Sequence, residues 1–107
     1  MRRENKNVRI KVPAGATTSE TVSVGLFAWA SVQFPIAIDG LSFSVQISNG
    51  DLWAPVVDTL GVVQADPAIV GGSVIPISEH VFSSSAFRIV MSEIQLAERE
   101  LIVELKT

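Results

Sequence analysis

Few side chains in this 107-residue chain have the types that catalysis or metal binding requires. His80 is the single histidine, and the chain contains neither cysteine nor tyrosine. No Gly-x-Ser-x-Gly segment marks a serine nucleophile. We interpret His80 as a loop residue beside a short helical turn predicted over residues 78–82, because Ser78 can cap such a turn. The sequence therefore predicts a protein that is not an enzyme, with no metal ion and no cofactor.

Carboxylates are the next candidates for chemistry, and four of them lie at or near predicted turns: Asp39, Asp51, Asp58 and Asp66. Aspartates in such positions commonly accept hydrogen bonds from nearby backbone amides. Calcium takes the same kind of oxygen ligand, but the spacing of these residues matches no calcium-binding loop. Turn capping is therefore the preferred interpretation.

The two tryptophans are candidates for ligand binding. Trp53 follows the turn formed by Asn49, Gly50 and Asp51, where an exposed indole ring could stack on a sugar. A tryptophan at the start of a strand more often packs over the end of a hydrophobic core. We therefore predict core packing for Trp53, and more strongly for Trp29, which lies in an uncharged run.

Charge is distributed unevenly along the chain. Residues 1–12 carry a local charge of +4, so the rest of the chain carries −7 for a net charge of −3. We predict that residues 1–7 form a mobile basic arm, in which Arg2, Arg3 and Lys6 bind acidic groups of a partner. Nucleic acid is disfavoured as that partner, because no aromatic residues are interleaved with the basic ones.

Alternating apolar and polar residues predict that residues 8–107 form one all-β domain. In residues 41–48, Leu41, Phe43, Val45 and Ile47 alternate with polar residues, which is typical of a central strand with one face in a core. Turn residues separate the other segments of this kind. The pattern indicates a single antiparallel β-sandwich or jelly roll of about seven to nine short strands. The predicted strands span residues 8–12, 19–24, 30–34, 41–48, 52–57, 60–65, 74–77, 86–92 and 98–106.

An uncharged run extends from Thr21 to Ile38. Its length approaches that of a membrane span, but recurring polar residues, Gly25 and Pro35 favour buried strands instead. Together with the 48% hydrophobic composition, this run supplies more apolar surface than one small sandwich is expected to hide. We therefore predict a homotrimer, with Leu26, Phe27 and Trp29 near the subunit contact.

The second half of the chain resembles small β-sandwich virion proteins encoded in the structural gene clusters of tailed bacteriophages. The features that carry the resemblance are the alternating strand over residues 41–48, the turn at residues 49–51, Trp53, the pair Asp58 and Gly61, Ile77, Phe82, the segment Phe87-Arg88-Ile89, and a last strand that begins near Ala97 and Arg99. The basic arm is not part of it. The resemblance implies a structural component of the virion, of the capsid decoration (cement) type, whose partner is the major capsid protein.

Two functions thus remain open at this stage. The first is a non-enzymatic decoration protein that binds and stabilises the capsid shell. The second is a carbohydrate-binding β-sandwich module of a phage tail, a fibre or a secreted enzyme, which would use Trp53 together with Asp51 and Asn49.

Overall fold

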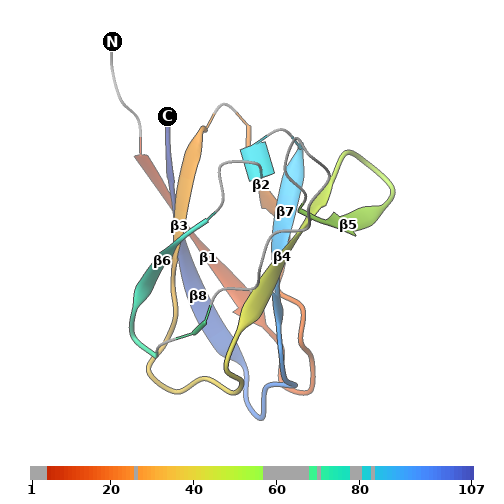
Figure 1. The fold of residues 1–107 in the computed structure, drawn as a ribbon. Coiled ribbons are helices and arrows are strands. Elements are labelled where there is room, and N and C mark those ends of the chain that lie inside the picture. The colour runs from red at the N-terminus through yellow and green to blue at the C-terminus, as the bar shows by residue number, and fades with distance from the viewer. Residues whose placement is uncertain (1–4, 26, 57–67, 70, 78–80, 83) are drawn as a thin grey trace.

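In the part of the chain that the structure describes, eight strands form two antiparallel sheets that pack face to face (Figure 1). The computed structural model describes residues 5–25, 27–56, 68–69, 71–77, 81–82 and 84–107. One sheet has the strand order β1-β8-β3-β6 and the other has the order β2-β7-β4-β5. The strands are β1 (Asn5–Val12), β2 (Val22–Ser23), β3 (Trp29–Gln33), β4 (Phe43–Ser48), β5 (Trp53–Pro55), β6 (Val74–Pro76), β7 (Ala86–Met91) and β8 (Arg99–Lys106).

The pairing pattern is that of a jelly roll. The first strand pairs with the eighth, the second with the seventh, the third with the sixth and the fourth with the fifth, and successive pairs alternate between the two sheets. Pairing of β8 with β3 and of β7 with β4 then completes each sheet. The predicted all-β sandwich and the central position of β4 are therefore confirmed. Among the described residues, no helix is long and apolar enough to cross a membrane.

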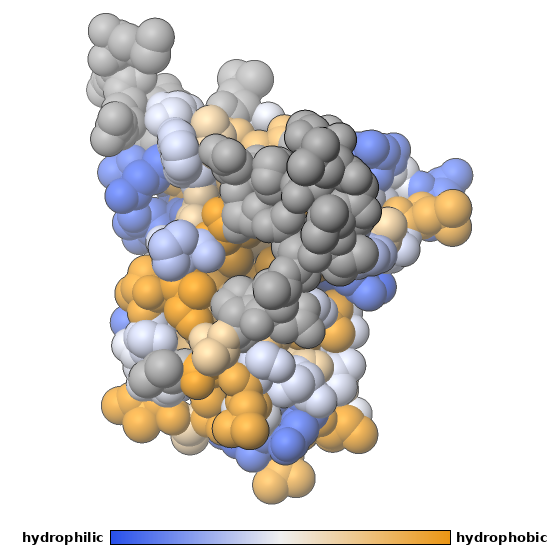
Figure 2. Space-filling view, viewed as in Figure 1, coloured by the Kyte–Doolittle hydropathy of each residue, from blue (hydrophilic) through white to orange (hydrophobic). Residues whose placement is uncertain are grey.

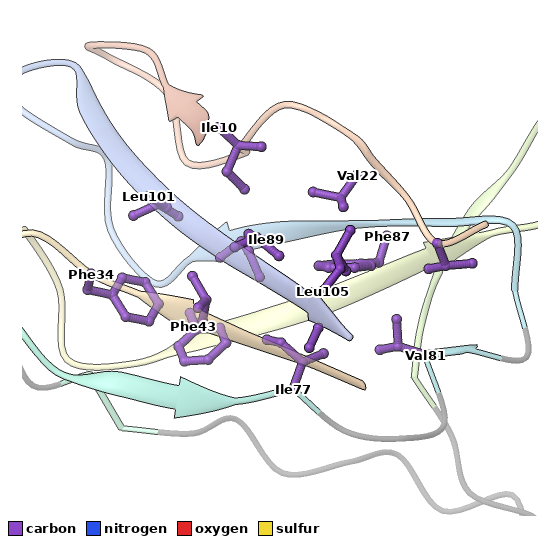
Figure 3. Packing of buried hydrophobic residues seen from close by; sticks show 14 of the residues in the cluster. Ile10, Val22, Phe34, Phe43, Ile77, Val81, Phe87, Ile89, Leu101 and Leu105 are labelled. Atoms are coloured by element: carbon purple, nitrogen blue, oxygen red, sulfur yellow. The ribbon is translucent and has the colours of Figure 1, made fainter. Parts of the chain in front are cut away.

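The core lies between the inner faces of the two sheets, as the period-two alternation requires. In β8, Leu101, Val103 and Leu105 are buried, and Phe87 and Ile89 of β7 face them from the other sheet (Figure 3). Phe34 and Phe43 bring the two sheets together near one end, with ring centroids 4.9 Å apart and an interplanar angle of 50°. Val45 and Ile47, which we predicted to be buried, are only partly buried beside this core.

Two boundaries differ from the prediction. Strand β1 begins at Asn5, inside the segment predicted to be a mobile arm, because Asn5, Lys6 and Asn7 pair with the last residues of β8. Strand β4 begins at Phe43, so Leu41 is not a core residue. The predicted strand over residues 60–65 and His80 lie outside the described residues.

Replacing Phe43 by alanine is expected to destabilise the fold by about 3–5 kcal/mol, since it removes a buried ring and leaves a cavity between the sheets. Ser44→Ala, on the outer face of the same strand, is the matched control and is expected to change stability by less than about 0.5 kcal/mol. Urea unfolding followed by circular dichroism measures both. Equal midpoints for the two variants would contradict the register of β4.

Candidate docking surface

A buried glutamine joins three loops at one end of the sandwich. Gln95 lies in the β7–β8 connection, and its side chain is 0% exposed. Its Oε1 accepts a hydrogen bond from the Asp39 backbone N–H (3.0 Å), and its Nε2 donates to the backbone carbonyls of Asp39 (2.7 Å) and Glu93 (3.1 Å). Its own backbone N–H donates to the Ala16 carbonyl, and its carbonyl accepts from the Gly15 N–H. The β1–β2, β3–β4 and β7–β8 loops are thus bonded to a single residue.

The side chain of Asp39 adds a second link between two of these loops. Its Oδ2 accepts a hydrogen bond from the Leu96 backbone N–H (2.8 Å) and forms an ion pair with Nη2 of Arg99 (3.0 Å). The Leu96 hydrogen bond and, next to it, the hydrogen bond from Arg99 hold the pKa of Asp39 below its usual value. Asp39 therefore accepts a backbone amide, as predicted for a turn aspartate, but this amide belongs to the β7–β8 loop and not to its own turn.

Ser92 fixes the start of the β4 segment. The backbone N–H groups of Leu41 and Ser42 both donate to its Oγ, each at 3.2 Å. Successive N–H groups of a strand point in opposite directions, so two that meet at one oxygen cannot continue the strand. Gly40 precedes them with φ of +103°, and a Cβ there would lie 2.7 Å from the Ser92 Oγ. This local geometry turns the Leu41 side chain outward.

These loops present an aliphatic surface to the outside. Four large side chains are strongly exposed, namely Ile36 (87%), Leu41 (82%), Ile94 (59%) and Leu96 (83%). They come from the β3–β4 and β7–β8 loops, which lie at the end opposite the start of β1 and the C-terminus (Figure 1). We call these four side chains the aliphatic end surface. Orange, hydrophobic side chains gather along this lower end in Figure 2.

Acidic groups flank the aliphatic end surface. Glu93 and Glu98 are exposed on either side of Ile94 and Leu96 in the sequence. The described ion pairs involve Arg9 with Glu100, Arg99 with Asp39 and Lys106 with Glu104, so neither flanking glutamate belongs to one of them. The end surface thus combines exposed aliphatic side chains on hydrogen-bonded loops with exposed glutamates next to them in the sequence, a combination suited to a partner that offers apolar and basic groups.

The predicted site residues lie elsewhere and do not form one cluster. Lys6 of β1 is exposed, and its strand pairs with β8 at the end opposite the aliphatic end surface. Trp29 lies at that same end of β3, and Phe27 packs partly buried against the core. The prediction of core packing for Trp29 is wrong, because its position in β3 faces outward. Arg2, Arg3 and Leu26 lie outside the described residues, so their partner contacts stay predictions.

Trp53 is also not a core residue. It lies on the outer face of β5, where the Arg88 guanidinium carbon is 4.2 Å from the centroid of its ring. The Nε of Arg88 donates to the Gln46 Oε1 at 2.8 Å, so the guanidinium is held against the ring by β4. The stacking gives Trp53 a covered face without placing it between the sheets. A depression at the β4–β5 turn is lined by residues that include Asn49 and Asp51, but Trp53 is not one of them.

The aliphatic end surface was not predicted from the sequence, because strand patterns do not cover loop residues. The sequence feature that could have indicated it is the presence of two large apolar residues, Ile94 and Leu96, in a loop between two predicted strands. The alternation that begins at Leu41 pointed instead to a core position. Among the described residues, no group of three or more histidines, aspartates and glutamates lies close enough to hold a metal ion.

Comparison with known proteins gives no family. No family model and no curated protein matches this sequence. A solved structure described as "Bacillus endospore appendages form a novel family of disulfide-linked pili" aligns with a TM-score of 0.49 and 12% identity. The alignment covers 97% of this chain and 86% of that chain. A likeness at this level carries no argument about function.

The Asp39 contacts predict a pH-dependent stability. Because the pKa of Asp39 is lowered in the folded state, its carboxylate stabilises the fold above the ordinary aspartate range, near pH ~4. This contribution is lost as the pH falls through that range and below it. Asp39→Asn is therefore expected to be less stable than the wild type at pH ~7, with a difference that shrinks toward pH ~3.

Urea unfolding at a series of pH values measures this difference. Asp51→Asn, in the exposed β4–β5 turn, is the control for the loss of one carboxylate. A difference for Asp39→Asn that stays constant with pH, or that Asp51→Asn reproduces, would show that the Asp39 contacts do not favour the ionised form.

Proposed function

We propose that this protein is a non-enzymatic structural protein of a bacteriophage virion, a capsid decoration protein that binds the major capsid protein shell. The observation that carries the proposal is the aliphatic end surface, which stands on loops fixed by Gln95 and Asp39. The resemblance of residues 39–105 to small β-sandwich virion proteins supplies the partner, and the jelly-roll pairing is compatible with it. The virion surface is then where the protein is located.

The physical state of the end surface supports attachment to another protein. Ile36, Leu41 and Leu96 expose aliphatic area to water. Covering this area with a partner protein lowers the free energy, because apolar surface is then removed from water. Their loops are already ordered by hydrogen bonds, so binding does not have to order them. Gln95 and Ser92 bond several backbone groups of these loops to one another. The aliphatic side chains of the surface themselves require no hydrogen bond from a partner.

Oligomerisation is a second part of the proposal. A closed trimer matches the three-fold and quasi-three-fold positions of capsids that decoration proteins of this type occupy. Phe27, which we predicted from the sequence to lie near the subunit contact, is only partly buried and leaves part of its ring for such a contact. Light scattering of the free protein, with and without capsids, measures this state.

The carbohydrate-binding alternative built on Trp53 has less support. A sugar that stacks on an indole needs a free ring face, and the Arg88 guanidinium already occupies one face of this ring. Displacing the guanidinium would also break its hydrogen bond to Gln46.

Substitutions in the aliphatic end surface test the attachment. Leu41→Ser and Leu96→Ser are each expected to weaken capsid binding by about tenfold or more, because covering a leucine side chain contributes ~1.5–3 kcal/mol. Both side chains are exposed in the free protein, so folding stability should change little. Co-sedimentation with capsids assembled from the major capsid protein of the same gene cluster measures binding.

Leu52→Ser is the matched control for these variants. Leu52 is 81% exposed, in the same range as the two leucines of the end surface, but it lies in the β4–β5 turn. This variant is expected to bind like the wild type. Equal weakening by all three substitutions, or undiminished binding by Leu41→Ser and Leu96→Ser, would reject the end surface as the attachment site.

A further inference from the structure

The outer face of the β1-β8-β3-β6 sheet carries an exposed tryptophan among polar side chains. Trp29 is 58% exposed, and its backbone partner across the sheet is Lys106, which in turn pairs with Asn5. The next row along β8 places Glu104 between Asn7 and Ser31. Ala30, Val103 and Leu105 are the buried positions of these strands, so the residues named before them belong to the outer face.

A shallow depression adjoins the indole. It has a volume of about 120 Å³ and is lined by Trp29, Ala30, Ser31, Glu104 and Lys106. Pockets for drug-sized ligands measure roughly 300–1,000 Å³, so this depression fits a single ring and not a larger compact ligand. Its lining combines one flat apolar ring with a hydroxyl, a carboxylate and an ammonium group.

We propose that Trp29 and its polar neighbours form a carbohydrate-binding site for a β-1,4-linked pyranose chain, because such a chain is extended and can place one flat ring on the indole and the next along the polar row of the sheet. The indole ring offers a flat apolar face for the C–H face of one sugar ring. Ser31, Glu104 and Lys106 provide donors and acceptors for its hydroxyl groups, and the amides of Asn5 and Asn7 extend the polar row toward the next ring.

The polar neighbours favour a sugar over an apolar protein surface at this position. Glu104 and Lys106 form an ion pair of 3.0 Å, and their side chains are 39% and 44% exposed. An apolar partner that covered Trp29 would take this ion pair out of water without supplying hydrogen bonds, which is costly. Sugar hydroxyls can bond to both charged groups and leave the pair intact. The aliphatic end surface has the opposite character, because its four side chains have no polar atoms.

The different surroundings of the two tryptophans also favour a sugar as the ligand of Trp29. The ring of Trp53 is covered by Arg88, whereas no described cation or ring contact covers Trp29. Carbohydrate binding, which the sequence suggested for Trp53, is therefore assigned to the other tryptophan. Trp29 lies beside the start of β1 and the C-terminus, at the end of the sandwich opposite the aliphatic end surface (Figure 1). A molecule attached by the end surface leaves Trp29 accessible, but the sugar site does not require that attachment.

Tryptophan fluorescence of the free protein tests the proposal. In Trp53→Phe, Trp29 is the single fluorescent indole, because the chain has two tryptophans. Titration with the hexasaccharides cellohexaose and chitohexaose is expected to change this fluorescence saturably for at least one of them. Calorimetry should show binding by wild type and Trp53→Phe, and at least tenfold weaker binding by Trp29→Ala. Glu104→Ala should weaken binding as well while leaving the indole signal of the unliganded protein in place.

Two results would overturn the proposal. One is the absence of saturable binding of either hexasaccharide at millimolar concentration. The other is binding that survives Trp29→Ala and is lost in Trp53→Phe. Should light scattering show a trimer that Trp29→Ala converts to monomers, with no sugar response, Trp29 belongs to a subunit contact instead. None of these measurements uses capsids, so failure of the sugar site is distinguishable from failure of capsid attachment.

Discussion

The buried amide of Gln95 is the constraint on which one end of this molecule depends. A primary amide removed from water must find partners for two donor hydrogens and an oxygen, and leaving one unpaired costs ~1–3 kcal/mol. The Gln95 side chain meets this demand with three backbone groups from two loops, while its own backbone bonds to a third loop. The loops cannot move apart without exposing or orphaning these groups. Their order therefore depends on hydrogen bonding in addition to the packing of Phe34 and Ile38 with the core.

The hydrogen bonds of the loops explain why large aliphatic side chains can remain exposed to solvent there. In the strands, apolar residues hold the structure together, and Phe43, Phe87 and Leu105 are accordingly buried. In the β3–β4 and β7–β8 loops, the hydrogen bonds of Gln95, Asp39 and Ser92 supplement the packing of the core, so Leu41 and Leu96 can stay outside. A loop stabilised by its polar atoms can present apolar side chains in a fixed arrangement, which lowers the conformational entropy lost when a partner binds.

The strands could be predicted from the sequence, but the end surface could not. Alternation is a local property, and the segments that became β1 and β4 each show it over five or more residues. The Gln95–Asp39 contact joins residues 56 positions apart, and no local sequence pattern predicts it. Leu41 was misassigned because the alternation continues past the true start of β4, which is set by the distant Ser92 hydroxyl. Trp29 and Trp53 were misassigned because both fall on outward positions, and register depends on strand pairing.

The two ends of β8 show how a single strand can serve two independent surfaces. At its first residue, Arg99 joins Asp39 in the network beneath the aliphatic end surface. At its last residue, Lys106 lies beside Trp29 and pairs with Glu104 on the outer face. Seven residue steps of extended chain, at ~3.3 Å each, place these positions about 23 Å apart. Effects of substitutions at such a separation are generally additive. Each surface can therefore change its partner while the shared core and the strand between them stay the same.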